Sequence, residues 1–221
     1  MTRNTANTLC ALLLLIAAVA AALAYTKLPA QVPIHWNAAG DIDGYADKLN
    51  AVLLGPGMAA LAWLLMWAVP HVSPKGFRTD NFQATVHVLQ VVLVAFCVAI
   101  GGIILAAGFG VHITPERVFP IAIGALFVVI GNYLGKTQKN FFVGIRTPWT
   151  LASDEVWMRT HRMGGYVFVA TGAAMVIIGA LDLGHFPFMI AVIAAGLMPV
   201  AYSFLIYRQL EGFSDDAQNI D

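Results

Sequence analysis

Six long stretches without an acidic or basic side chain, except for histidine, limit what this sequence can fold into. They cover residues 5–26, 49–74, 81–115, 118–135, 163–181 and 183–207. A helix that crosses the hydrocarbon core of a bilayer needs about 20 predominantly apolar residues, because each residue advances about 1.5 Å. Each stretch holds a segment of about that length. The sequence therefore predicts an all-α, polytopic membrane protein with six transmembrane helices.

Composition excludes several other classes of protein. The chain is 59% hydrophobic and 11% charged, whereas soluble domains are about 45–50% apolar and about 25% charged. Its 12 basic and 12 acidic residues give a formal net charge of +0, so no overall positive field attracts nucleic acid. The two cysteines, Cys10 and Cys97, lie in apolar runs and cannot build a disulfide framework or a four-ligand zinc site.

The distribution of Lys and Arg predicts the orientation, since cytoplasmic segments carry an excess of both. With a cytoplasmic N-terminus, nine basic residues lie inside: Arg3, Lys75, Arg78, Lys136, Lys139, Arg146, Arg159, Arg162 and Arg208. Three lie outside: Lys27, Lys48 and Arg117. Both termini are then cytoplasmic.

The first stretch has a second interpretation, as a cleaved signal peptide. It has a short basic start, an apolar core at residues 11–20 and a small-x-small sequence at residues 22–24. Cleavage would leave five spans in the same orientation, and the N-terminal mass of the purified protein distinguishes the two.

Two polar segments are too long to be simple connectors, and the first, residues 28–50, lies on the predicted outer side. Prolines favour an extended start, and turns are predicted at Gly40 and at Asp43-Gly44. The candidate binding residues are His35, Asn37, Gly40, Asp41, Asp43 and Lys48. Three interpretations stay open: turn-closing residues at the lipid interface, a ligand-binding or gating surface, and a metal site. A calcium loop fits poorly because its closing glutamate is missing.

The second polar segment, residues 136–162, lies on the predicted inner side and carries a net charge of +3. Thr147-Pro148 predicts an extended entry, and Ser153 is a suitable N-cap for a helix that starts near Asp154. Trp157 and His161 share one face of that helix. The segment is either a basic loop lying on anionic headgroups, a docking surface for a cytoplasmic partner, or the inner wall of a site between helices.

Catalytic and cofactor templates do not fit the chain. The glycines of residues 131–137 follow a lipid-length helix and fall one residue short of a phosphate-binding loop, so close helix packing explains them better. No zinc-protease or nucleophile-elbow motif occurs.

No Asp, Glu, Lys or Arg lies at the centre of a span, which argues against a proton pump. Gln90, Asn132 and Thr171 are expected to hydrogen-bond between helices. We predict no cofactor, no metal and no enzymatic activity.

The two polar segments resemble the SdpI family of bacterial membrane proteins. The outer segment resembles the family's N-terminal domain of unknown function in Leu28-Pro29, Pro33-x-His35-x-Asn37, Gly40, Gly44 and Lys48. The inner segment resembles its SdpI module in Gly131-Asn132, Asn140, Gly144-Ile145-Arg146-Thr147-Pro148-Trp149-Thr150, Trp157 and His161-Arg162. The resemblance implies a multi-pass protein of the bacterial cytoplasmic (inner) membrane. The family's named member confers immunity to a secreted toxic peptide and holds a repressor at the membrane as a signal receptor.

These observations lead to one organisation of the chain. Residues 1–75 form a two-helix unit with a structured outer loop at 28–50, residues 76–210 form a four-helix SdpI-like module with a cytoplasmic loop at 136–162, and residues 211–221 form an acidic tail. The inner functional surface is predicted to contain Asn132, Asn140, Gly144, Arg146, Thr147, Trp149, Trp157 and Arg162. Arg146 is the predicted main donor of charge-assisted hydrogen bonds.

The predicted function is immunity to, or sensing of, a toxic peptide or another envelope-active compound. The expected partners are the lipid bilayer, a secreted peptide and a cytoplasmic regulator, without nucleic acid. One alternative is a transporter or permeability factor for a small amphiphile. The other is a membrane-surface enzyme that uses His35 with Asp41 or Asp43 as acid–base groups.

Overall fold

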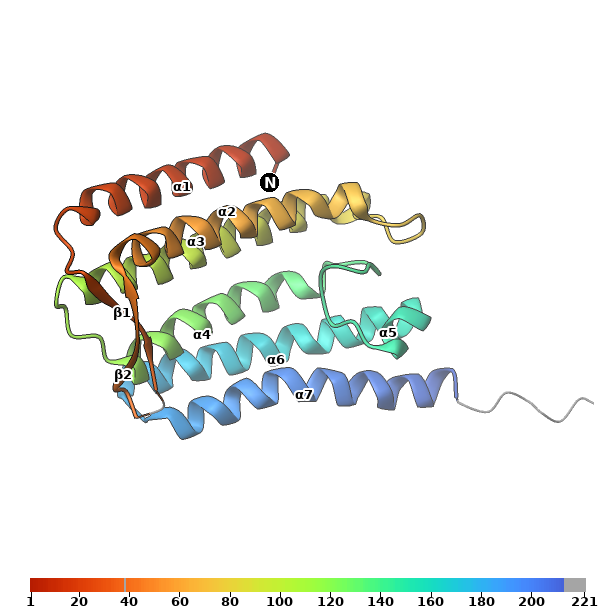
Figure 1. Ribbon diagram of the computed structural model, residues 1–221. Coiled ribbons are helices and arrows are strands. Elements are labelled where there is room, and N and C mark those ends of the chain that lie inside the picture. Colours follow the sequence, from red (N-terminus) through yellow and green to blue (C-terminus); the bar gives the residue numbers. More distant parts are fainter. Residues whose placement is uncertain (38, 213–221) are drawn as a thin grey trace, which may run out of the picture.

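The computed structural model describes residues 1–37 and 39–212, and six long helices run side by side through them (Figure 1). They are α1 (Arg3–Tyr25), α2 (Lys48–Val72), α3 (Gln83–Gly108), α4 (Pro115–Leu134), α6 (Asp154–Leu181) and α7 (His185–Leu210). All six are long and apolar enough to cross a membrane. The prediction of an all-α bundle of six transmembrane helices is confirmed.

The helices pack in two groups. Helix α3 lies against α1 and α2, whereas α6 lies between α4 and α7, and the contact between α3 and α4 is small. Figure 1 shows the two groups one above the other. The sequence-based division at residue 75 places α3 with the last three helices, but α3 packs mainly with the first two.

Glycines bring α4 and α6 into direct backbone contact. A Cβ atom on Gly124 would lie 2.5 Å from the carbonyl oxygen of Gly172, and one on Gly131 would lie 2.7 Å from that of Gly165. Small residues allow such approach in membranes, where burial gives little driving force between helices. The expected packing role of Gly131 is confirmed, while Gly135 makes only ordinary contact.

Polar side chains inside the spans behave in two ways. The Gln90 amide in α3 donates to Asn7 Oδ1 in α1 over 3.2 Å, as predicted for a bond between helices. The same prediction is wrong for Asn132 and Thr171, which donate to Val128 O and Val167 O one turn back in their own helices. A short polar side chain reaches the carbonyl four residues earlier more readily than a neighbouring helix.

The outer segment forms a β-hairpin, with β1 (Gln31–Trp36) antiparallel to β2 (Ile42–Asp47). The turn lies between the strands, as expected near Gly40. The second predicted turn, at Asp43-Gly44, is wrong because Gly44 pairs with His35 within the ladder. Leu28 and Val32 anchor the hairpin in the core formed by α1, α2 and α3.

The inner segment contains one unpredicted element, the short helix α5 (Pro148–Ala152). A second short helix, η1 (Asp80–Phe82), leads into α3. The predicted start of α6 is confirmed: Ser153 Oγ accepts from the Val156 amide, and Asp154 and Glu155 occupy the first turn. Of the predicted acidic tail, residues 213–221 lie outside the described residues.

Candidate functional site

The outer hairpin brings two of its predicted site residues into direct contact. His35 Nδ1 lies 2.5 Å from Asp43 Oδ1, and the two side chains are 70% and 43% exposed. A Cβ atom on Gly44 would lie 2.8 Å from the Cβ of His35. A larger residue at position 44 would therefore push His35 away, so Gly44 sets the position of the pair.

Asn37 and Gly40 close the hairpin turn. Asn37 Oδ1 accepts from the amides of Ala39 and Asp41 over 2.9 and 3.0 Å. Gly40 has a φ of 85°, and a Cβ there would lie 2.6 Å from a Glu116 carboxylate oxygen at the start of α4. This geometry supports the turn-closing interpretation for Asn37 and Gly40 and shows that the hairpin tip rests on α4.

The remaining outer candidates do not join the His35–Asp43 pair in one cluster. Asp41 is exposed beside the turn, and Lys48 lies over the Tyr25 ring with Nζ 4.8 Å from its centroid. No group of three His, Cys, Asp or Glu side chains among the described residues could hold a metal ion.

In the inner segment, Asn140 is fully buried and folds the loop around itself. Its amide nitrogen donates to Gln138 O and Val143 O over 2.7 and 2.9 Å. Its amide oxygen accepts from the backbone N–H groups of Phe142 and Val143 over 2.8 and 2.7 Å. These bonds use both amide hydrogens and both oxygen lone pairs of Asn140.

His161 attaches the loop to α6. The Ile145 N–H donates to His161 Nε2 over 2.8 Å, and His161 Nδ1 lies 2.8 Å from Trp157 O. Because a backbone N–H can only donate and a carbonyl can only accept, the imidazole is neutral with its hydrogen on Nδ1. Gly144, with a φ of 119°, lies against the same ring and leaves no room for a Cβ atom.

Trp157 stacks on His161, with ring centroids 3.9 Å apart, and its Nε1 donates to Thr137 O over 3.0 Å.

We expect Trp157→Phe to keep the stack and lose this buried bond, which costs about 1 kcal/mol of stability. Thermal unfolding in detergent, followed by circular dichroism, measures the change. Trp67→Phe is the matched control, because the exposed Trp67 ring packs on His71 in a similar way. Equal melting temperatures of the two variants would contradict this role for Trp157.

Helix α7 supports the second half of the inner motif. Thr147 and Thr150 form a capping box at α5, and Thr147 Oγ1 lies 3.0 Å from Ser203 Oγ. The Trp149 ring packs edge-on against Phe204 at 5.1 Å. Five motif residues, Asn140, Gly144, Thr147, Trp157 and His161, therefore build the loop rather than present side chains to a ligand.

Three predicted inner residues lie outside that buried cluster. Arg146 is exposed and donates to Phe141 O within its own loop. Arg162 and Asn132 are exposed on α6 and α4. Arg146, the predicted main donor of charge-assisted hydrogen bonds, therefore bonds to the backbone of its own loop.

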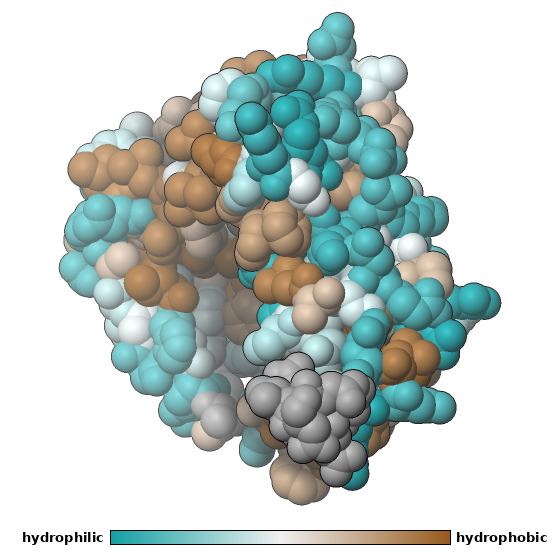
Figure 2. Space-filling model, turned by 90° about the vertical axis from the view of Figure 1, so that its right-hand side faces the viewer, coloured by the Kyte–Doolittle hydropathy of each residue, from teal (hydrophilic) through white to brown (hydrophobic). Residues whose placement is uncertain are grey.

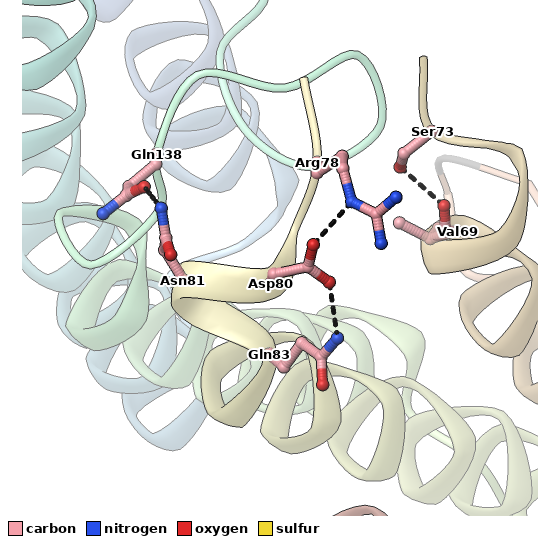
Figure 3. Close-up of polar contacts among 7 residues, drawn as sticks. All are labelled: Val69, Ser73, Arg78, Asp80, Asn81, Gln83 and Gln138. Atoms are coloured by element: carbon pink, nitrogen blue, oxygen red, sulfur yellow. Dashed lines mark hydrogen bonds and ion pairs between the residues drawn. The ribbon is translucent and has the colours of Figure 1, made fainter. Parts of the chain in front are cut away.

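Sequence reasoning missed an open cleft of about 810 Å³ where the two helix groups meet at this end. It is lined by Gly76, Arg78, Asp80 and Asn81, by residues 135–139, and by Asp154, Trp157 and Met158 of α6. Figure 2 views this end of the molecule and shows a hollow with apolar side chains in its depth and hydrophilic ones beside it. Asn81 Nδ2 donates to Gln138 Oε1 over 3.1 Å and bridges the two groups (Figure 3).

Four charged side chains of the cleft form two ion pairs, while Lys136 lies over the Tyr133 ring with Nζ 4.5 Å from its centroid. Arg78 Nε lies 2.5 Å from Asp80 Oδ2, Gln83 donates to the other carboxylate oxygen (Figure 3), and Lys139 pairs with Asp154 at 2.7 Å. The hydrogen bond to Asp80 and its charge raise the pKa of the Arg78 guanidinium. Arg78 and Asp80 lie in the link between the second and third spans. The only sequence signal for this link was its basic charge.

Together, six membrane-length helices, an outer hairpin and a self-bonded inner loop define a polytopic integral membrane protein with polar structure at both ends. A family model described as the SdpI/YfhL protein family matches residues 136–204, and another, Domain of unknown function (DUF1648), matches residues 12–60. The two matched segments contain the inner loop and the outer hairpin, so both polar segments of this chain are similar to segments described by these family models.

A curated relative is similar to the chain over most of its length. Immunity protein SdpI of Bacillus subtilis (strain 168) is 21% identical over 191 residues, which cover 85% of this chain and 89% of that protein. No solved structure matches the chain significantly.

Proposed function

We propose that this protein gives immunity to a membrane-active peptide or a similar envelope-active amphiphile, which the outer hairpin recognises. The name of the Bacillus subtilis relative supports the immunity function. The observation that carries the choice of site is the exposed His35–Asp43 pair on a hairpin that is anchored on both sides. Leu28 and Val32 hold one side in the first helix group, and the Trp36–Phe119 contact holds the other on α4.

The surface of the hairpin suits an amphiphilic ligand. His35, Asp41 and Asp43 offer exposed polar groups, while Ile42 and Tyr45 are 41% and 56% exposed beside them. An aromatic side chain with a polar tip is favoured at a membrane interface, where a membrane-active peptide first binds. The predicted orientation places this surface outside the cell.

Recognition is favoured over catalysis for the His35–Asp43 pair. The pair resembles the acid–base half of a hydrolytic site, but residues 28–50 contain no Ser, Thr or Cys to act as a nucleophile. We propose accordingly that the protein is not an enzyme. We also propose that the inner cleft, with its two ion pairs, Lys136 and the exposed Met158, is the surface on which a cytoplasmic regulator would dock.

Loss of protection tests the outer site. We expect His35→Ala and Asp43→Asn, each expressed in a sensitive bacterial strain, to lower the inhibitory concentration of the peptide about tenfold, because each removes a charge-assisted hydrogen bond. The probes are cationic amphipathic helical peptides, an apolar helical peptide and a cyclic lipopeptide, tested first against the wild-type protein.

Two controls make the result specific. His185→Ala changes an exposed histidine at the same end of the bundle, outside the hairpin, and should leave protection intact. Arg146→Ala tests the inner loop instead. Full protection by both hairpin variants at normal membrane levels would refute the outer site, and peptide-dependent flux in proteoliposomes would support a transporter.

A further inference from the structure

A second polar cavity lies inside the first helix group, near the inner ends of α1, α2 and α3. Its volume is about 210 Å³. The polar side chains that line it are Arg3, Asn7, His71, Arg78, Asp80, Gln83, His87 and Gln90. His87 and Gln90 are buried, with 9% and 3% of their surface exposed. Polar groups at this depth in a membrane protein are costly unless they have partners.

The ion pairs and hydrogen bonds around this cavity leave the positive charge of Arg3 without a partner among the described residues. Arg3 forms no ion pair with any described residue, whereas Arg78 is held by Asp80. His71 Nδ1 lies 2.9 Å from Trp67 O and His87 Nδ1 lies 3.3 Å from Met1 O. Since a carbonyl only accepts, each Nδ1 donates.

An apolar groove of about 400 Å³ adjoins the cavity on the lipid-facing side. Ala60, Trp63 and Leu64 line it, and Asn7 and Trp67 border both the groove and the cavity. Asn7 Oδ1 accepts from Trp63 Nε1 and from Gln90 Nε2, over 3.3 and 3.2 Å. This shared wall keeps the polar cavity and the apolar groove side by side.

We propose that this combined site binds an anionic phospholipid, with its phosphate in the cavity and an acyl chain in the groove. The unpaired Arg3 guanidinium complements a phosphate, and basic pockets between helices on the cytoplasmic side are suited to anionic lipid headgroups. The adjoining groove selects a lipid over free phosphate, because only a lipid places an acyl chain beside its phosphate. This proposal is independent of the proposed immunity function.

Native mass spectrometry of the full chain, released from detergent after addition of lipid, tests the proposal. We expect phosphatidylglycerol to remain bound about tenfold more than phosphatidylcholine, because one charge-assisted contact accounts for a factor of that size. Inorganic phosphate at matched concentration should not raise the melting temperature, whereas phosphatidylglycerol should. Equal retention of the two lipids, or equal protection by inorganic phosphate, would overturn the proposal.

Variants separate the headgroup contact from the acyl chain contact. Arg3→Gln should reduce the preference for phosphatidylglycerol about tenfold, and Ala60→Trp, which fills the groove, should lower its retention. Arg208→Gln changes an exposed arginine in the last turn of α7 and is the matched control. Arg3 and Ala60 are exposed, so both variants should fold. Wild-type retention by both variants, or a loss equal to that of Arg208→Gln, would show that the lipid binds elsewhere.

Discussion

We expect Gly172→Leu to separate α4 from α6 and to destabilise the protein by about 4 kcal/mol, at the upper end of overpacking effects. A Cβ atom at position 172 would lie 2.7 Å from Gly124 O and 2.8 Å from the Val128 backbone nitrogen. Both atoms belong to the backbone of α4, so no side-chain rotation can relieve the clash. The whole helix must move, and the neighbouring Gly131–Gly165 contact moves with it.

The matched control for Gly172→Leu is Gly196→Leu in α7, where no atom lies within 4 Å of the added Cβ. Both changes add the same apolar side chain to a membrane-spanning helix. Thermal unfolding in detergent and the rate of proteolysis should change only for Gly172→Leu. A similar melting temperature for the two variants would contradict the packing role of the glycine contacts.

The second large effect is expected for Gly144→Ala in the inner loop. The φ of 119° is unfavourable for any residue with a side chain, and the added methyl group would collide with the His161 ring. Moving the ring breaks the bond from the Ile145 N–H. Backbone strain of about 1–3 kcal/mol and a lost buried bond of similar size predict a loss of about 3 kcal/mol.

Gly135→Ala is the control for this variant, because its added Cβ would lie 3.6 Å from the nearest atom and its φ is −68°. Limited proteolysis at residues 136–147 should become faster in Gly144→Ala and stay unchanged in Gly135→Ala. Thermal unfolding gives the global stability of both variants. If the loop of Gly144→Ala resisted protease as well as the wild type does, His161 would not be its anchor.

The start of the inner helix is predicted correctly because a helix cap depends on near neighbours. Ser153 caps α6 through the Val156 amide, three residues later. The turn predicted from local sequence at Asp43-Gly44 is wrong, because Gly44 pairs with His35 on the opposite strand. The interhelical bond predicted for Asn132 is also wrong, because its own helix satisfies this side chain.

The candidate sites depended more on distant contacts. Asn37 and Gly40 were recognised as candidates, but the Gly40–Glu116 contact that fixes the hairpin tip joins residues far apart in the sequence. Arg78 and Asp80 were not recognised, because the cleft exists only where the two helix groups meet. The role proposed for Arg3 likewise depends on the tertiary structure, which places it in the lining of the same cavity as His71 and His87.

The sequence by itself determined the six spans and the division between apolar helices and polar loops. Those properties follow from the transfer of side chains between water and lipid, which each segment undergoes separately. Only the tertiary structure decided that the motif residues of the inner loop, Asn140, Gly144 and His161, bond to one another and that the His35–Asp43 pair stays exposed. Hydrogen-bond partners and cavities depend on which helices pack together, and in a membrane that choice rests on close backbone contacts at a few small residues.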